Sequence, residues 1–114
     1  MKKTLKFSPD LVPLVLSGEK TSTWRLFDDK DLKDGDEMIF IDWDGMQPFA
    51  EAMLTSVVVK PLDELSAEDK EGHEKFSSDE EMYATYSRYY KQPVGPETLV
   101  KIVRFKITAF LQTT

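Results

Sequence analysis

Five stretches of the chain have the hydrophobic and polar pattern of β-strands. They span residues 4–8, 21–26, 37–42, 49–59 and 98–111. The third stretch is apolar on both faces in its middle, as in a covered sheet or a closed barrel. The fourth is long enough to predict a bend or bulge, which is one way in which a small barrel closes.

A short helix is predicted between the first two strands. Asp10 is its expected N-cap, Pro13 lies in its first turn, where a missing N–H costs nothing, and Gly18 ends it. Its apolar face consists of Leu11, Leu14 and Val15.

Two more helices are predicted before the last strand. The first is strongly charged and covers about residues 67–75, and the second begins at the Ser-x-x-Glu capping box of Ser78. The second helix carries apolar and aromatic residues at helical spacing: Met82, Tyr86 and Tyr89 or Tyr90. This stripe favours a seam that faces the core over a base-stacking platform, because such platforms normally lie on strands or loops.

The order of elements is therefore β-α-β-β-β-α-α-β, with turns at Asp34-Gly35 and Asp44-Gly45. Antiparallel neighbours need no crossover connection, and five strands of this length can curl into a barrel. We predict one α+β domain over residues 1–114, a small and mainly antiparallel barrel. It has a short N-terminal helix and a two-helix insertion before the last strand.

Composition narrows the classes of function. The 114 residues contain no cysteine, which excludes disulfides, thiolate metal sites and a cysteine nucleophile. The net charge of -6 argues against a protein that binds nucleic-acid phosphates over its whole surface. It is still compatible with a local basic cleft. No apolar run is long enough to span a bilayer, so we expect a cytoplasmic protein without membrane contact, and a monomer by default.

Candidate chemistry is concentrated at the joint between the first helix and the second strand. The sequence from Gly18 to Arg25 places a lysine, three hydroxyl side chains and an arginine within six residues. Spacing alone favours an ordinary helix stop followed by a strand with polar residues facing water.

The chain resembles the ASCH family, small domains related to PUA-type RNA-binding barrels. The resemblance rests on Gly-x-Lys-Thr-x-Thr-x-Arg at Gly18 to Arg25, on the turn at Gly35-Asp36 and on the long last strand near Val100 to Phe110. It covers essentially the whole chain and implies a PUA-like β-barrel.

Within that family the chain is most similar to short bacterial proteins that hydrolyse the amide of N4-acetylcytidine. The resemblance implies a catalytic set of Lys20, Thr23 and Glu74, with Arg25 at the cleft. We expect the substrate to be bound by Gly18, Thr21, Trp24, Arg25 and Trp43, although the two tryptophans could equally belong to the core. Glu19, Ser22 and Trp24 differ from the residues typical of that group. The length of the segment after Lys70 leaves both Glu71 and Glu74 as the site carboxylate.

The implied chemistry sets a geometric condition. A threonine hydroxyl needs a base, and strict strand alternation would place Lys20 and Thr23 on opposite faces, so Lys20 must lie in the turn before the pleat begins. Thr23 would then be the nucleophile, Lys20 the base and Glu74 the acid or an orienting partner, with backbone N–H groups stabilising the oxyanion.

Two other readings use the same cleft. One is non-catalytic binding of single-stranded RNA or a modified nucleotide, in which Trp24 or Trp43 stacks a base and cations contact phosphate, among them Lys101, Arg104 and Lys106. The other is a ribonuclease. The single His73 is expected to be a solvated side chain, and we expect no metal and no cofactor.

Overall fold

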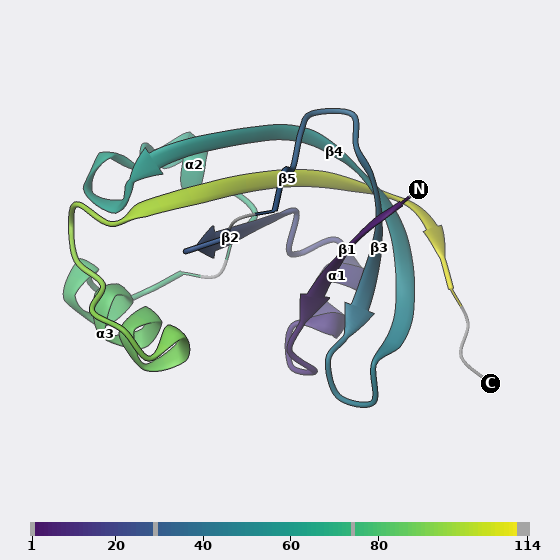
Figure 1. Cartoon of the computed structure of the whole chain (residues 1–114), viewed down its shortest axis with the longest axis horizontal. Helices are drawn as coiled ribbons and strands as arrows, with labels where there is room; N and C mark the ends of the chain where they lie inside the picture. The colour runs from purple at the N-terminus through teal and green to yellow at the C-terminus, as the bar shows by residue number, and fades with distance from the viewer. Residues whose placement is uncertain (1, 29, 74, 112–114) are drawn as a thin grey trace.

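The computed structural model describes residues 2–28, 30–73 and 75–111 and confirms the predicted α+β order. The elements are β1 (Lys3–Phe7), α1 (Val12–Ser17), β2 (Ser22–Leu26), β3 (Glu37–Asp42), β4 (Gln47–Pro61), the 3-10 helix η1 (Leu62–Glu64), α2 (Ala67–Lys70), α3 (Asp79–Tyr90) and β5 (Leu99–Phe110) (Figure 1).

The described strands form one five-stranded sheet in the order β1-β3-β4-β5-β2. The β1–β3 pair is parallel and the other three pairs are antiparallel. The long strands β4 and β5 arch over the molecule, so the sheet curls into a half-barrel with β1 and β2 as its two edges (Figure 1). The predicted barrel-like, mainly antiparallel architecture is confirmed.

The predicted irregularity in the fourth strand is confirmed at two places. The register of β4 against β5 shifts between Glu51 and Ala52 and again between Leu54 and Ser56. Beside the second shift, the consecutive residues Ile102 and Val103 of β5 are both buried. Successive side chains of a strand point to opposite faces, so β5 contributes Val103 to one core and Ile102 to a second core on the other face.

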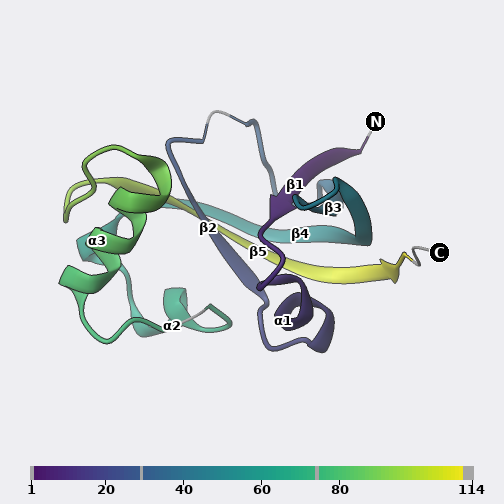
Figure 2. The ribbon, with the colours of Figure 1, turned by 90° about the horizontal axis from the view of Figure 1, so that it is seen from below.

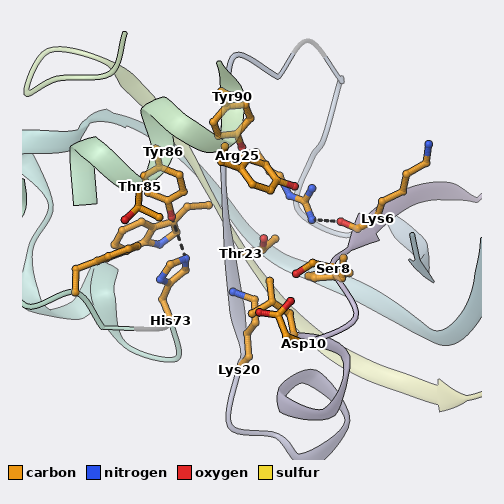
Figure 3. A pocket seen from close by; sticks show the side chains of 15 residues that line it. Lys6, Ser8, Asp10, Lys20, Thr23, Arg25, His73, Thr85, Tyr86 and Tyr90 are labelled. Atoms are coloured by element: carbon orange, nitrogen blue, oxygen red, sulfur yellow. Dashed lines mark hydrogen bonds between the residues drawn. The ribbon is translucent and has the colours of Figure 1, made fainter. Parts of the chain in front are cut away.

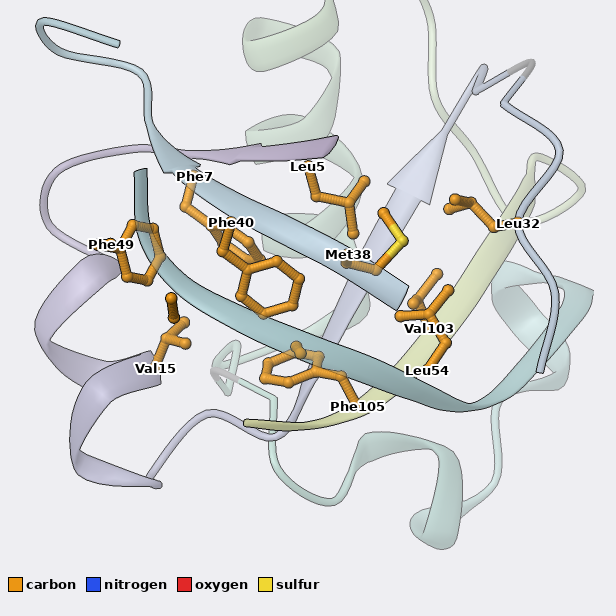
Figure 4. Close-up of a cluster of buried hydrophobic side chains, with 12 residues drawn as sticks. Leu5, Phe7, Val15, Leu32, Met38, Phe40, Phe49, Leu54, Val103 and Phe105 are labelled. Atoms are coloured by element: carbon orange, nitrogen blue, oxygen red, sulfur yellow. The ribbon is translucent and has the colours of Figure 1, made fainter. Parts of the chain in front are cut away.

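The first core fills the half-barrel, and α1 covers one end of it (Figure 4). Its buried residues are Leu5, Phe7, Val15, Leu32, Met38, Phe40, Phe49, Ala50, Ala52, Leu54, Val103 and Phe105. The second core lies under α3 and contains Trp24, Leu26, Leu62, Met82, Val100 and Ile102. In Figure 2, β2 runs between α2 and α3 on one side and β1 and α1 on the other.

Side chains join the two edge strands. Arg25 Nη2 of β2 donates to the carbonyl oxygen of Lys6 in β1 at 2.8 Å. Beyond β2, Lys30 Nζ donates to the Thr4 carbonyl oxygen at 2.6 Å. These bonds take the place that backbone pairing would have in a closed barrel.

The predicted helix ends are partly wrong. Leu11, not Asp10, is the N-cap of α1, and of the predicted apolar face only Val15 is fully buried. The charged helix stops at Lys70, well before residue 75, because the chain turns through Gly72 with a φ of +74°. The cap at Ser78 is confirmed, since its side chain accepts from the Glu81 backbone N–H at 3.1 Å.

A small polar network holds α2 against β4. Lys60 Nζ donates to Asp69 Oδ2 at 2.7 Å, and the Ser66 backbone N–H donates to the same oxygen at 2.9 Å. These bonds, Lys60 first, hold the pKa of the Asp69 carboxyl below its usual range. Among the described residues no helix is long and apolar enough to cross a membrane.

Removing this carboxylate is expected to weaken the fold in a pH-dependent way. A carboxyl whose pKa is lower in the folded state stabilises the protein above its unfolded pKa, near pH 4, and stops doing so as the pH falls through the folded value. Asp69→Ala should lower the free energy of unfolding by about 1 kcal/mol at pH 7, the usual size for a lost cap. Between pH 7 and pH 2, the free energy of unfolding of the variant, measured in urea, should fall less than that of the wild type. Glu97→Ala, which removes an exposed carboxylate, is the control, and equal curves for the two variants would contradict the assignment.

Candidate functional site

The end of α1 places Lys20 outside the strand pleat. Gly18 has a φ of +85°, its N–H donates to the Val15 carbonyl oxygen at 3.2 Å, and the Lys20 N–H donates to the Leu14 carbonyl oxygen at 3.0 Å. The chain thus completes a tight turn before β2 begins at Ser22. The geometric condition for a shared site is met, because Lys20 lies in this turn and not in the strand.

Lys20 and Thr23 line one cavity of about 310 Å³. The cavity is bounded by the end of β1 and the loop after it, by the start of β2, by the segment between α2 and α3, and by α3 itself. Both polar side chains are almost completely buried, with exposed fractions of 3% for Lys20 and 5% for Thr23. Figure 3 shows the Lys20 amine directed toward the level of Thr23, with Arg25 beyond it along the strand.

Aromatic rings form one wall of this cavity. The Trp24 indole stacks on His73 with 3.8 Å between ring centroids and 13° between planes, and the Tyr86 hydroxyl lies 3.5 Å from His73 Nε2. Tyr89 and Tyr90 continue the wall at the end of α3. The expectation of a solvated His73 is wrong, because its ring is packed between β2 and α3.

The tyrosine stripe of α3 has two roles. Met82 is buried in the second core, and Tyr86 and Tyr90 pack against that core as predicted. The same two rings also line the cavity, and Tyr89 is 53% exposed at its rim. Helical spacing could not reveal this second role, because the facing wall comes from β1 and β2, far away in the sequence.

Arg25 lies at the cavity and also holds the fold. Besides its bond to Lys6, its guanidinium lies 5.1 Å from the Phe7 ring centroid. Its Nε is buried and has no hydrogen-bond partner in the described structure. Burial lowers the pKa of the Arg25 guanidinium, an effect that Tyr90 partly opposes, and the group stays charged at neutral pH.

The segment after α2 is bonded to the start of β2. The Gly72 carbonyl oxygen accepts from the backbone N–H groups of Thr21, at 2.9 Å, and of Ser22, at 3.2 Å. The Glu71 carbonyl oxygen accepts from Arg104 Nη1 at 3.1 Å. These bonds hold this segment beside the cavity that contains Lys20.

Glu71 and Glu74 are the two candidates for the site carboxylate. Glu71 lines a different cavity, between α2 and the start of α3, and not the one that Lys20 and Thr23 share. Glu74 lies outside the described residues. On either side of it, His73 and Phe76 line the Lys20 cavity.

The remaining predicted binding residues, Gly18, Thr21 and Trp43, do not line the cavity itself. Gly18 and Thr21 shape the turn and the contact with Gly72. Trp43, in the loop between β3 and β4, is 48% exposed and stacks on Tyr89 with 6.3 Å between centroids and 10° between planes. It therefore lies at the rim of the site, next to a residue of the aromatic wall.

Two cations considered for phosphate binding already have protein partners. Lys101 Nζ donates to the Lys30 carbonyl oxygen at 2.7 Å, and Arg104 binds the carbonyl oxygens of Glu68 and Glu71. Lys106 is exposed. Across the described ranges, no group of three or more His, Asp or Glu side chains is arranged to hold a metal ion.

Replacing Gly72 should show how strongly the fold depends on the contact with β2. A Cβ at this position would lie 1.8 Å from Thr21 Oγ1, on a backbone with positive φ. Gly72→Ala is expected to lower the free energy of unfolding by about 2–4 kcal/mol, which combines backbone strain with overpacking.

Two glycines provide matched controls for this prediction. Gly18→Ala has positive φ but open space, so it should cost about 1 kcal/mol. Gly95→Ala has open space and no such φ, so urea unfolding should show little change. A Gly72→Ala cost no larger than that of Gly18→Ala would show that the contact with Thr21 contributes nothing.

Comparison with known proteins finds likeness in solved structures alone, since no family model and no curated protein matches the chain. Protein EF3133 of Enterococcus faecalis V583, of family DUF984, has a TM-score of 0.80 at 23% identity, covering 100% of this chain and 84% of that one. The ASCH domain of Lactobacillus crispatus JV V101 has a TM-score of 0.66 at 19% identity, covering 85% and 69%. ASCH from Zymomonas mobilis has a TM-score of 0.66 at 16% identity, covering 96% and 69%.

Proposed function

We propose that this chain, which has the fold of ASCH domain proteins, binds a nucleoside and hydrolyses the amide of N4-acylated cytidine. The observation that carries the proposal is the shared cavity of Lys20 and Thr23. An amine and a hydroxyl, both nearly buried, line a space of about 310 Å³ beside an aromatic wall. This volume lies at the lower end of the range for small-molecule sites, about 300–1,000 Å³.

The aromatic wall supports the choice of a nucleobase. Each base has a flat π-face, and stacking of a base on an aromatic side chain contributes about 1–3 kcal/mol. Tyr86 and Tyr90 line the same cavity as Thr23. A base stacked on one of these rings would therefore lie in the cavity that holds the proposed nucleophile.

The proposed reaction is acyl transfer in two steps. Thr23 Oγ attacks the acyl carbonyl carbon and passes its proton to the neutral Lys20 amine. As the carbon–nitrogen bond breaks, this proton passes from Lys20 to cytidine N4, directly or through Glu74, so the Lys20 amine is neutral again. Water next attacks the ester on Thr23, Lys20 accepts the water proton and the Thr23 oxygen regains one. The products are cytidine and the carboxylic acid.

We assign Glu74 one of two roles, as a proton donor to the leaving nitrogen or as an orienting partner of Lys20. As an acid it would protonate the departing nitrogen, and as an orienting group it would hold the Lys20 amine. Burial works in favour of a neutral amine, whereas a neighbouring carboxylate works against it. Of the two candidate carboxylates, Glu71 is disfavoured because it lines the other cavity.

Thr23 variants test the nucleophile. Thr23→Val keeps the branched shape in the strand but removes the hydroxyl, so release of cytidine from N4-acetylcytidine should fall at least about 10³-fold. Thr23→Ser keeps a hydroxyl and should retain a measurable part of the rate. Chromatographic assay of cytidine, with circular dichroism to confirm folding, would measure both. Full activity of a folded Thr23→Val variant would exclude Thr23 as the nucleophile.

A second candidate function is binding of single-stranded RNA, which the exposed Trp43 and Tyr89 rings favour. These rings could stack a base next to the one in the cavity. Affinity for a short single-stranded RNA should then fall as salt rises, and Trp43→Ala should weaken it by about 1–3 kcal/mol without changing the affinity for free cytidine. Fluorescence anisotropy at several salt concentrations would measure this. Equal loss of affinity for both ligands would argue against a separate stacking position.

A further inference from the structure

The free edge of β2 faces the cavity. β2 is the last strand of the described sheet and pairs with β5 on one side only. Backbone N–H and C=O groups of successive residues in an antiparallel strand point alternately to the two sides. The Thr21 carbonyl oxygen, just before the strand, accepts from the Phe105 N–H, whereas the Thr21 N–H donates to Gly72. Two and four residues further on, Thr23 and Arg25 therefore direct both of their backbone groups toward β5.

The intervening residues therefore direct their backbone groups away from the sheet. Two hydrogen bonds confirm that the N–H groups of these residues point away from β5. The Ser22 N–H donates to the Gly72 carbonyl oxygen at 3.2 Å, and the Leu26 N–H donates to the Tyr90 hydroxyl at 3.2 Å. These contacts occupy the two ends of the free edge, and Trp24 lies midway between them, at the cavity.

We infer that the backbone N–H of Trp24 donates a hydrogen bond to the acyl carbonyl oxygen of the substrate. This inference rests on the proposed function. The N–H belongs to the residue directly after Thr23, so an oxygen bound to it places the carbonyl carbon within reach of the Thr23 hydroxyl. In α/β-hydrolases, which have a different fold, the backbone N–H of the residue after the nucleophile is one of the oxyanion donors.

The geometry also explains why this donor is ready before substrate arrives. Ser22 and Leu26 are held on either side of it, by Gly72 and by Tyr90. The Trp24 side chain is fixed by its stack on His73. A donor held in position by the fold needs little reorganisation when charge develops on the oxygen, which is the condition for strong transition-state stabilisation.

The same residue carries a second donor. The indole Nε1 of Trp24 is buried and has no hydrogen-bond partner in the described structure. The chain has two tryptophans, so selective ¹⁵N-tryptophan labelling gives two backbone and two indole signals. The backbone N–H of Trp43, which donates to the Phe7 carbonyl oxygen at 3.0 Å, is an internal reference.

The first test is an NMR titration of the labelled Thr23→Val variant with N4-acetylcytidine and, separately, with cytidine. We expect N4-acetylcytidine to move the Trp24 backbone proton downfield by several times the shift that cytidine causes. The Trp43 backbone signal should move little. Assignment uses Trp43→Phe in the same background.

Several outcomes would overturn the inference. Equal shifts of the Trp24 backbone signal with both ligands, or a shift confined to its indole signal, would show that this N–H does not contact the acyl group. If the wild type still releases cytidine in that case, the proposed function stands without the inference. Absence of both turnover and binding would reject the two together.

A backbone substitution supplies the kinetic test. Replacing Trp24 by its α-hydroxy acid through nonsense suppression converts its amide to an ester, which removes the N–H and makes the Thr23 carbonyl a weaker acceptor. Because the N–H points away from β5, no ladder donor is lost, and circular dichroism confirms that the variant is folded. We expect kcat for N4-acetylcytidine to fall about 10²–10³-fold with little change in KM. An unchanged kcat would overturn the inference, and Thr23→Ser, measured in parallel, reports independently on the nucleophile.

Discussion

The hydrogen bond from the Arg25 guanidinium to the Lys6 carbonyl oxygen joins two strands that the sheet leaves unpaired. A closed barrel would satisfy both edges with a backbone ladder. Here β1 and β2 stay apart, and side chains from β2 and the loop after it reach across to β1. Because Arg25 makes this connection, it serves the fold and lines the candidate site at the same time.

The incomplete closure also creates the site. The cavity opens beside the free edge of β2, with α3 on one side and the end of β1 on the other. Gly72 and Tyr90 hold the two ends of that edge. Lys20 reaches the cavity from the turn before the strand, and Thr23 from within it. A fully paired barrel would have buried the edge at Trp24 in a ladder and left no backbone donor there.

Local rules were enough to predict the strands, the turn at Gly18 and the bulge in β4, because each depends on periodicity or on a single glycine. They also led to the condition that Lys20 lies before the pleat. They failed where the answer depends on tertiary contacts. His73 looked solvated because its neighbours are charged, yet it stacks on Trp24. The helix after Ala67 ends early because Gly72 turns against Thr21, a contact between distant segments.

The proposed amide hydrolysis depends on the buried amine of Lys20 as its base. The most direct test incubates the purified wild type and Lys20→Met, which keeps a long unbranched side chain but removes the amine, with N4-acetylcytidine. The wild type should release cytidine and acetate in equal amounts, and the folded variant should release neither. Equal release by both proteins would contradict the role of Lys20, and no release by a folded wild type would contradict the proposed hydrolysis itself.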